Sequence, residues 1–202
     1  MTNITSIIFD LGNVLIDWDP RYLYRKLLPT ETEVEWFLEN ICNDDWNKKH
    51  DEGQPFEEGI TKLSKIYPQY ANLIQDWFGR WEEMLGDPLE ETVKILAELK
   101  NLGIPLYILS NWSAETFPKA EAIFDFLNWF DGKIISGEVG IIKPNPEIFY
   151  ALTKKFNLNP ENSVFIDDKL INIKAAKLIG FHGIHFKNPE LLRNDLKKMS
   201  LI

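Results

Sequence analysis

Polar side chains follow three apolar runs of this chain at the point where each run ends. They are Asp10 after residues 5–9, Ser110 and Asn111 at the end of residues 105–110, and Asp167 and Asp168 at the end of residues 163–167. Ligands of open parallel sheets bind outside the carboxyl ends of the strands, so we expect these side chains to gather at one edge of a sheet. A lone acid at a strand end usually caps a turn, but three such ends together predict a functional site.

Lys143, in the stretch GIIKPNPE, adds one cation to this set of carboxylates, hydroxyl and amide. Carboxylates at close range repel one another, and a hard divalent cation with oxygen ligands is the usual way to neutralise them. Mg²⁺ takes one or two carboxylates and fills its other positions with water and substrate phosphate. Ser110 and Lys143 would then bind phosphate oxygens. The residue types therefore predict a magnesium site that acts on a phosphorylated ligand.

Five short apolar runs, rich in Ile, Val and Phe and with little alternation, predict buried parallel strands. They span residues 5–10, 105–110, 133–136, 163–167 and 183–186. Helical segments separate most of them, one opened by Asp87-Pro88, one by Asn145-Pro146, and one over residues 172–179. This alternation predicts an α/β fold with a parallel sheet covered by helices.

Residues 17–86 show no strand signal and predict helices over 21–28, 30–41, 56–66 and 69–85. Trp36, Trp77 and Trp81 lie at helical spacing and are interpreted as the core of this helical block. We therefore predict a core of residues 1–16 and 87–202 and an inserted helical cap of residues 17–86. Gly86 is expected to serve as a hinge between the two parts.

Composition limits the classes of partner. The chain has 202 residues, is 45% hydrophobic and has a formal net charge of -9, which argues against nucleic acid or an anionic membrane as the main partner. The single cysteine, Cys42, fits a reducing compartment, and no signal peptide or membrane span is apparent. We expect a soluble, cytoplasmic protein; no pattern predicts an oligomeric state.

The order Phe-Asp-Leu-Gly-Asn-Val, Leu-Ser-Asn, Lys-Pro and Ile-Asp-Asp resembles the four motifs of the haloacid dehalogenase-like (HAD) hydrolase superfamily. It is most similar to bacterial phosphatases with an FDLGNV first motif and a helical cap, such as the sugar-1-phosphate phosphatases. The resemblance implies a Rossmann-like core with an all-helical cap. It also implies a Mg²⁺-dependent phosphomonoester hydrolase that acts on a small phosphorylated metabolite, such as a sugar phosphate, through an aspartyl-phosphate.

The resemblance also implies a role for each motif residue. Asp10 would be the nucleophile, Lys143 would pair with both the phosphate and Asp10, and Ser110 and the amide of Asn111 would bind the phosphate. The expected Mg²⁺ ligands are Asp10, the backbone carbonyl of Gly12, Asp168 and, through water, Asp167. Asn172 would hydrogen-bond to these ligands without contacting the metal itself. The alternative is that it only forms hydrogen bonds with the local backbone at the start of a helix.

Gly12 departs from the family pattern, because most HAD phosphatases carry a second Asp two residues after the nucleophile. That Asp protonates the leaving oxygen and then activates water, and such acid–base help is typically worth about 10²–10⁴-fold in rate. Either the substrate has a good leaving group, or the cap supplies the proton. The cap candidates are His50 and Asp51, beside Trp46, and Asp17 at the junction.

Two other functions stay open at this point. A 2-haloacid dehalogenase also lacks the second Asp, because halide needs no proton, and it needs no metal; the pair Asp167-Asp168 argues against it. The chain could also be a non-catalytic binding protein with this fold, which the complete set of Asp10, Ser110, Lys143 and Asp168 argues against.

Overall fold

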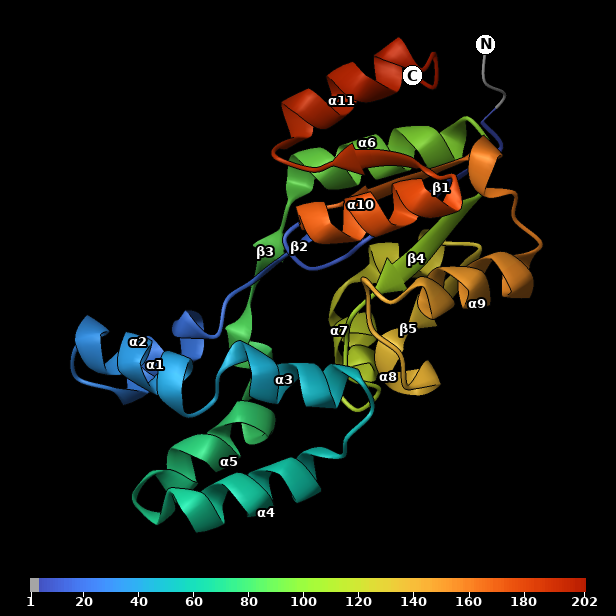
Figure 1. Ribbon diagram of the computed structural model, residues 1–202. Helices are drawn as coiled ribbons and strands as arrows, with labels where there is room; N and C mark the ends of the chain where they lie inside the picture. The colour runs from blue at the N-terminus through green and yellow to red at the C-terminus, as the bar shows by residue number, and fades with distance from the viewer. Residues whose placement is uncertain (1–3) are drawn as a thin grey trace.

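The computed structural model describes residues 4–202, and its centre is a five-stranded parallel sheet with the strand order β5-β4-β1-β6-β7 (Figure 1). The strands are β1 (Ser6–Phe9), β4 (Leu106–Ser110), β5 (Gly132–Ile135), β6 (Ser163–Asp167) and β7 (His182–His185). All five predicted strands are present, and each boundary lies within one residue of its prediction. The predicted α/β class with a parallel sheet is confirmed.

The central strand β1 pairs with β4 on one side and β6 on the other, and all four of its residues are buried. Successive side chains of a strand point to opposite faces of the sheet. Ile7 and Phe9 accordingly belong to one buried apolar cluster, whereas Ile8 belongs to another. Both faces of the sheet are covered, which explains why the strand sequences are continuously apolar.

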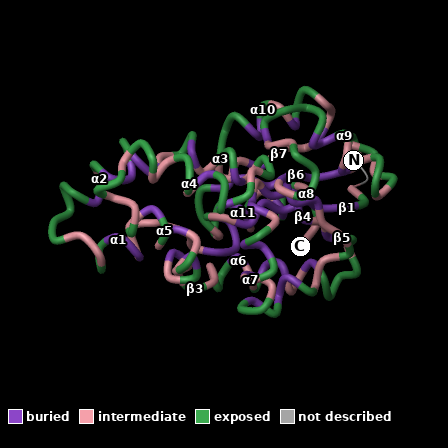
Figure 2. Tube along the Cα trace, turned by 90° about the horizontal axis from the view of Figure 1, so that it is seen from below, coloured by how far each residue is buried: buried purple, intermediate pink, exposed green. Residues whose placement is uncertain are grey.

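Helices cover the two faces of the sheet. The elements of this part are α6 (Glu90–Asn101), α7 (Phe117–Ile123), η3 (Asp125–Trp129), α8 (Ser136–Val139), α9 (Pro146–Phe156), η4 (Pro160–Asn162), α10 (Leu170–Ile179) and α11 (Pro189–Lys198). Leu96 of α6 and Leu196 of α11 belong to the apolar cluster of Phe9, whereas Phe149 of α9 belongs to that of Ile8. Figure 2 shows the strands as buried trace and the outer turns of the helices as exposed trace.

A block of helices stands to one side of the sheet (Figure 1, blue to teal). It contains α1 (Arg21–Leu27), α2 (Glu31–Asn40), α3 (Asp44–Asp51), α4 (Phe56–Ile66), η1 (Pro68–Tyr70), α5 (Ala71–Gly79) and η2 (Trp81–Met84). Trp77 and Trp81 are buried in it as predicted, but Trp36 is 45% exposed and packs on Tyr70 at the surface, so its interpretation as core was wrong. The helix α3 was not predicted, because most of its residues are polar.

Two short strands join the helical block to the sheet. β2 (Ile16–Trp18) and β3 (Leu85–Pro88) pair antiparallel, so the prediction that no strand begins or ends this region was wrong. The helix predicted to open at Asp87-Pro88 begins only at Glu90, because Pro88 belongs to β3. A Cβ on Gly86 would lie 3.1 Å from Asp17 Cβ, so the two strands leave little room for a side chain at this position.

Among residues 4–202, no helix combines the length and the apolar character that crossing a bilayer requires.

Gly137 lets α8 approach the loop that follows β4. A Cβ at this position would lie 2.4 Å from Ala114 N and 2.9 Å from Trp112 O, and both are backbone atoms that cannot rotate away. We expect Gly137→Ala to lower the free energy of unfolding by about 1–3 kcal/mol in urea titrations. Gly79→Ala is the control, because a Cβ there meets no atom within 4 Å; it should be neutral or stabilising. Equal effects of the two changes would contradict this account of Gly137.

Candidate active site

A buried lysine holds two carboxylates together at the carboxyl ends of the strands. Lys143 Nζ lies 2.9 Å from Asp10 Oδ2 and 2.7 Å from Asp167 Oδ2. The hydroxyl of Ser110, at the end of β4, donates to Asp10 Oδ1 over 2.8 Å. Asp10 follows β1, Asp167 ends β6, and Lys143 precedes α9, so three segments far apart in the sequence meet here.

The charges of this group are strongly coupled. Burial raises the pKa of Asp10 to about 6, against the lowering effect of Lys143 and with a further upward contribution from Asp167. Burial by itself would lower the pKa of Lys143, but the two carboxylates raise it above its usual value. Lys143 therefore stays protonated at neutral pH, and the site keeps more negative charge than one lysine neutralises.

Side-chain amides fix both ends of this ion pair. Asn111 Oδ1 accepts from the backbone N–H of Lys143 at 2.8 Å, and Asn111 Nδ2 donates to the Lys143 carbonyl at 3.0 Å. Asn172 Nδ2 lies 3.0 Å from each oxygen of Asp167, and the backbone N–H of Lys169 donates to Asp167 Oδ1. Because the side chain of Asn111 is engaged in this way, its backbone N–H is the group left to meet an anion.

Oxygen atoms of Asp10, Asp167 and Asp168 lie within 4.8 Å of one another. Both carboxylate oxygens of Asp167 accept hydrogen bonds from neighbouring groups. Asp168 is less buried than Asp167 and borders the cavity. The pKa of Asp168 is raised, mainly by burial and to a smaller extent by the negative charge of Asp10. A donor set of clustered carboxylate oxygens with unrelieved negative charge fits a hard divalent cation such as Mg²⁺.

A tight turn carries the chain away from Asp10. Three successive backbone N–H groups, those of Val14, Leu15 and Ile16, donate to the carbonyl of Leu11. Asn13 adopts a left-handed conformation with φ 57°, which asparagine tolerates better than most residues. Gly12 lines the cavity described next, and an added Cβ would meet nothing within 4 Å. Packing therefore does not require a glycine at position 12, because a side chain would fit there.

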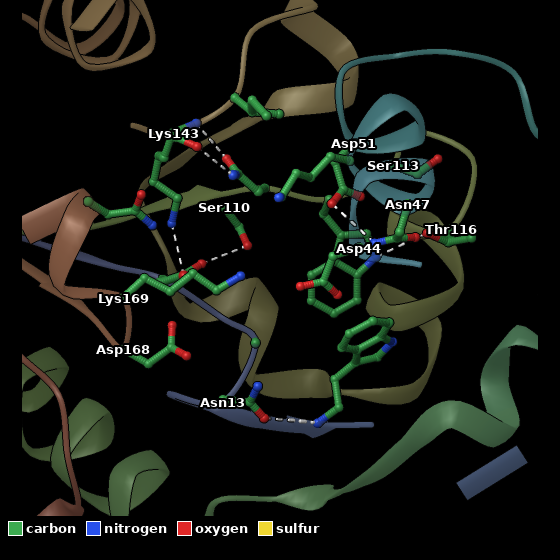
Figure 3. Close-up of a pocket in the computed structure, with 18 of the residues that line it drawn as sticks. Asn13, Asp44, Asn47, Asp51, Ser110, Ser113, Thr116, Lys143, Asp168 and Lys169 are labelled. Atoms are coloured by element: carbon green, nitrogen blue, oxygen red, sulfur yellow. Dashed lines mark hydrogen bonds and ion pairs between the residues drawn. The ribbon is translucent and has the colours of Figure 1, made fainter. Parts of the chain in front are cut away.

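A cavity of about 450 Å³ lies in front of these strand ends. Figure 3 shows Ser110, Lys143, Asp168 and Lys169 on one side of it and residues of α3 on the other. The α3 residues that line it are Asp44, Asn47, Lys48 and Asp51. Trp18, Trp81 and Trp112 contribute aromatic surface. The cavity is large enough for a small metabolite and combines a charged floor with a polar wall.

Of the cap candidates His50, Asp51 and Asp17 and their neighbour Trp46, the structure brings Asp51 to the cavity. Asp51 lines the cavity, whereas His50 is fully buried. The His50 ring stacks on Phe56 with ring centroids 4.0 Å apart, and its Nδ1 shares a hydrogen bond with the carbonyl of Gln54. Trp46 packs beside His50 within the helical block. Asp17, in β2, accepts a hydrogen bond from the hydroxyl of Tyr22, in α1, and does not line the cavity. His50, Trp46 and Asp17 are therefore not brought to the strand ends.

Sequence reasoning missed several cavity residues. Lys169 directly follows the two aspartates, and Asp44, Asn47 and Lys48 precede Asp51. The spacing of the last three with Asp51 is i, i+3, i+4 and i+7, which is one face of a helix. That spacing was readable in the sequence, but the predominance of polar residues concealed the helix.

The family model described as haloacid dehalogenase-like hydrolase matches residues 4–180. The chain belongs to this family. The predicted resemblance to this superfamily is thereby confirmed. Asp10 directly follows β1, the central strand of the parallel sheet.

Relatives of this haloacid dehalogenase-like hydrolase include named phosphatases. It is 26% identical to the sesquiterpene phosphatase astK of Aspergillus oryzae, over 98% of the chain and 97% of the relative. It is 27% identical to the D-ribitol-5-phosphate phosphatase of Bacteroides thetaiotaomicron, over 96% of the chain and 97% of the relative.

A solved structure supports the same fold. A HAD-family enzyme from Bacteroides thetaiotaomicron, crystallised with magnesium and inorganic phosphate, superposes with a TM-score of 0.69 at 25% identity. The match covers 92% of this hydrolase and 95% of that chain.

Removal of the buried cation tests how the site is held together. Lys143→Met leaves Asp10 facing Asp167 without a cation, and we expect it to lower the free energy of unfolding at pH 7, in EDTA, by about 3–5 kcal/mol. The change raises the folded-state pKa of Asp10 still further above its unfolded value. Ionised Asp10 then destabilises the fold, so the loss should shrink as pH falls through that pKa.

Urea titrations at pH 7 and pH 5 measure this difference. Lys154→Met, at an exposed position of α9, is the matched control and should change stability by less than about 0.5 kcal/mol at either pH. A Lys143→Met protein as stable as the parent at both values would contradict the central role of the ion pair.

Proposed function

We propose that this protein is a Mg²⁺-dependent phosphomonoester hydrolase that works through an aspartyl-phosphate on Asp10. The observation that carries the proposal is the placement of Asp10 at the cavity floor, 8% exposed, between Ser110 and Lys143 and within the cluster of three carboxylates. A nucleophile, a phosphate-binding hydroxyl, a fixed cation and a set of metal ligands are the parts that phosphoryl transfer requires.

In the proposed reaction, Asp10 attacks phosphorus, the ester bond to the leaving oxygen breaks, and water later cleaves the aspartyl-phosphate. Ser110, the backbone N–H of Asn111 and Lys143 bind the phosphate oxygens, where negative charge accumulates. Asp10, Asp168, the carbonyl of Gly12 and, through water, Asp167 would hold Mg²⁺. When bound, the ion would neutralise phosphate charge and relieve repulsion between the carboxylates.

We assign supporting roles to the rest of the structure. Asn172 holds Asp167, and Asp167 in turn holds Lys143. Residues 17–86 act as a cap over a core of residues 1–16 and 87–202, and the cavity between them receives the substrate. The phosphatase names of two relatives matched over nearly their whole length support the reaction class. The magnesium and phosphate in the related crystal structure support the metal.

We further propose a small polyhydroxylated phosphate ester, such as a sugar or polyol phosphate, as the substrate. The wall that α3 presents to the cavity contains Asp44, Asn47, Lys48 and Asp51, all of which form hydrogen bonds readily. Aromatic surface from Trp18 and Trp81 suits the apolar face of a sugar. A terpenyl chain would leave these polar groups without partners, at a cost in binding free energy.

The reaction class is tested by phosphate release from phenyl phosphate. We expect release with Mg²⁺ and loss of release in EDTA. Asp10→Asn, which removes the nucleophile, should reduce kcat by more than about 10³-fold. Asp125→Asn, an exposed change in η3, is the matched control. Metal-independent halide release from 2-chloropropionate would instead indicate a dehalogenase, and inactivity of the parent protein in both assays would favour a binding role.

The substrate class is tested by comparing kcat/KM for a polyol phosphate with that for an n-alkyl phosphate of equal length. We expect the polyol ester to be preferred by at least about 10-fold, the equivalent of one or two net hydrogen bonds. Asn47→Ala should reduce this ratio. A preference for the alkyl ester, or for a prenyl phosphate, would contradict the proposal.

A further inference from the structure

The proposed reaction needs a proton donor that the first motif does not supply. Gly12 has no side chain, although the space beside it would admit one. An alkoxide leaves phosphorus only slowly without protonation, and the later attack by water needs a base. Another group that reaches the cavity must therefore carry the proton.

Most acidic and basic groups that line the cavity are committed elsewhere or are poor donors. Asp10 and Asp168 belong to the carboxylate cluster, and Lys143 is enclosed between two carboxylates. Lys48 is exposed, and a hydrogen bond to Asp45 raises the pKa of its ammonium further above neutrality. Asp44 is exposed to solvent at the first turn of α3. Asp51 is the cavity carboxyl that is both partly buried and outside the cluster.

The position of Asp51 is fixed against the core, not only within its own helix. Asp51 is the last residue of α3, and its carbonyl accepts a hydrogen bond of 2.6 Å from Ser136 Oγ. The same Ser136 Oγ accepts from the backbone N–H of Trp112, in the loop that directly follows Ser110. A second link joins the backbone N–H of Phe56 to Glu115 Oε2 at 2.7 Å. The helix end is therefore held to the phosphate-binding loop.

The surroundings of the Asp51 carboxyl raise its pKa towards neutral pH. Burial raises its pKa to about 7; Lys169 and the backbone N–H of Ser113 oppose this, whereas Asp10 and Asp44 add to it. Asn47 Nδ2 donates to Asp51 Oδ2 over 3.3 Å and orients the group. Figure 3 shows Asp51 across the cavity from Ser110 and Lys169. A group that must both give and take a proton works best with a pKa near the operating pH.

We propose that Asp51 is the general acid and base of this site, a role that rests on the phosphatase function proposed above. As Asp10 bonds to phosphorus and the ester P–O bond breaks, the leaving oxygen takes the proton of the Asp51 carboxyl. Water then bonds to phosphorus and gives its proton to the Asp51 carboxylate, while the P–O bond to Asp10 breaks. The products are an alcohol and inorganic phosphate, and both aspartates return to their starting states.

The test exploits the demand of the leaving group for a proton. Phenyl phosphate releases a basic phenolate, whereas 2,4-dinitrophenyl phosphate releases a stable anion that needs no acid. For Asp51→Asn with Mg²⁺, we expect kcat/KM to fall by about 10²–10⁴-fold with phenyl phosphate and by less than about 10-fold with the dinitrophenyl ester. Equal losses with both esters, or no loss with phenyl phosphate, would overturn the assignment.

A matched variant and a pH profile separate proton transfer from a structural role. Asp44→Asn makes the same chemical change about two turns away on α3, and it should alter kcat/KM by the same factor for both esters. In the parent protein, kcat/KM for phenyl phosphate should decline as pH rises through about 7, where Asp51 loses its proton. This decline should be absent in Asp51→Asn, and its persistence there would overturn the proposal.

The two proposals fail in different ways. An inactive parent protein with both esters and Mg²⁺ would refute the phosphatase function itself. An active parent with a fully active Asp51→Asn variant would refute only the role of Asp51.

Discussion

The ammonium of Lys143, enclosed between Asp10 and Asp167, is the interaction on which the site depends. A cation buried in this way is stable only if charges and hydrogen bonds surround it, and here two carboxylates and an aromatic ring do so. The same contact brings the end of β1, the end of β6 and the segment before α9 to one point. β1 and β6 are neighbours in the sheet, and this places Asp10 and Asp167 within reach of one lysine.

Further contacts extend this arrangement outward. Asn111 and Asn172 each use a side-chain amide to hold one member of the ion pair. Ser136 and Glu115 then join the loop after β4 to the ends of α3 and α4. The helical block is thus tied to the loop that follows the phosphate-binding serine, and the polar face of α3 closes the cavity from the opposite side. Gly137, which allows α8 to approach that loop, belongs to the same set of contacts.

In the proposed mechanism, the nucleophile and the proton donor come from different parts of the chain. Asp10 stands on the sheet, and Asp51 stands on a helix inserted after it. The acid is then in place only when α3 lies over the strand ends, whereas an acid at Gly12 would stay beside Asp10 in any position of the cap. Proton transfer would therefore depend on the position of the cap over the strand ends. Because the cap also contacts the substrate in this proposal, proton transfer would depend on the identity of the substrate as well.

The sheet, and most of the polar residues at the floor of the cavity, were predictable from the sequence alone. Continuous apolar runs identify buried strands, and polar residues at their ends identify the edge where ligands bind, because both signals are local. Asp10, Ser110, Asp167 and Asp168 were singled out in this way, and Lys143 was added to them from the stretch GIIKPNPE. Only the tertiary structure decided between His50 and Asp51, and it also revealed α3, Lys169 and the short pair of strands β2 and β3. Adjacent residues of a helix point about 100° apart, so the way α3 docks on the core decides which of them faces the cavity. That docking depends on contacts with Ser136 and the loop after β4, which lie more than 50 residues away in the chain and leave no local pattern in the sequence of α3.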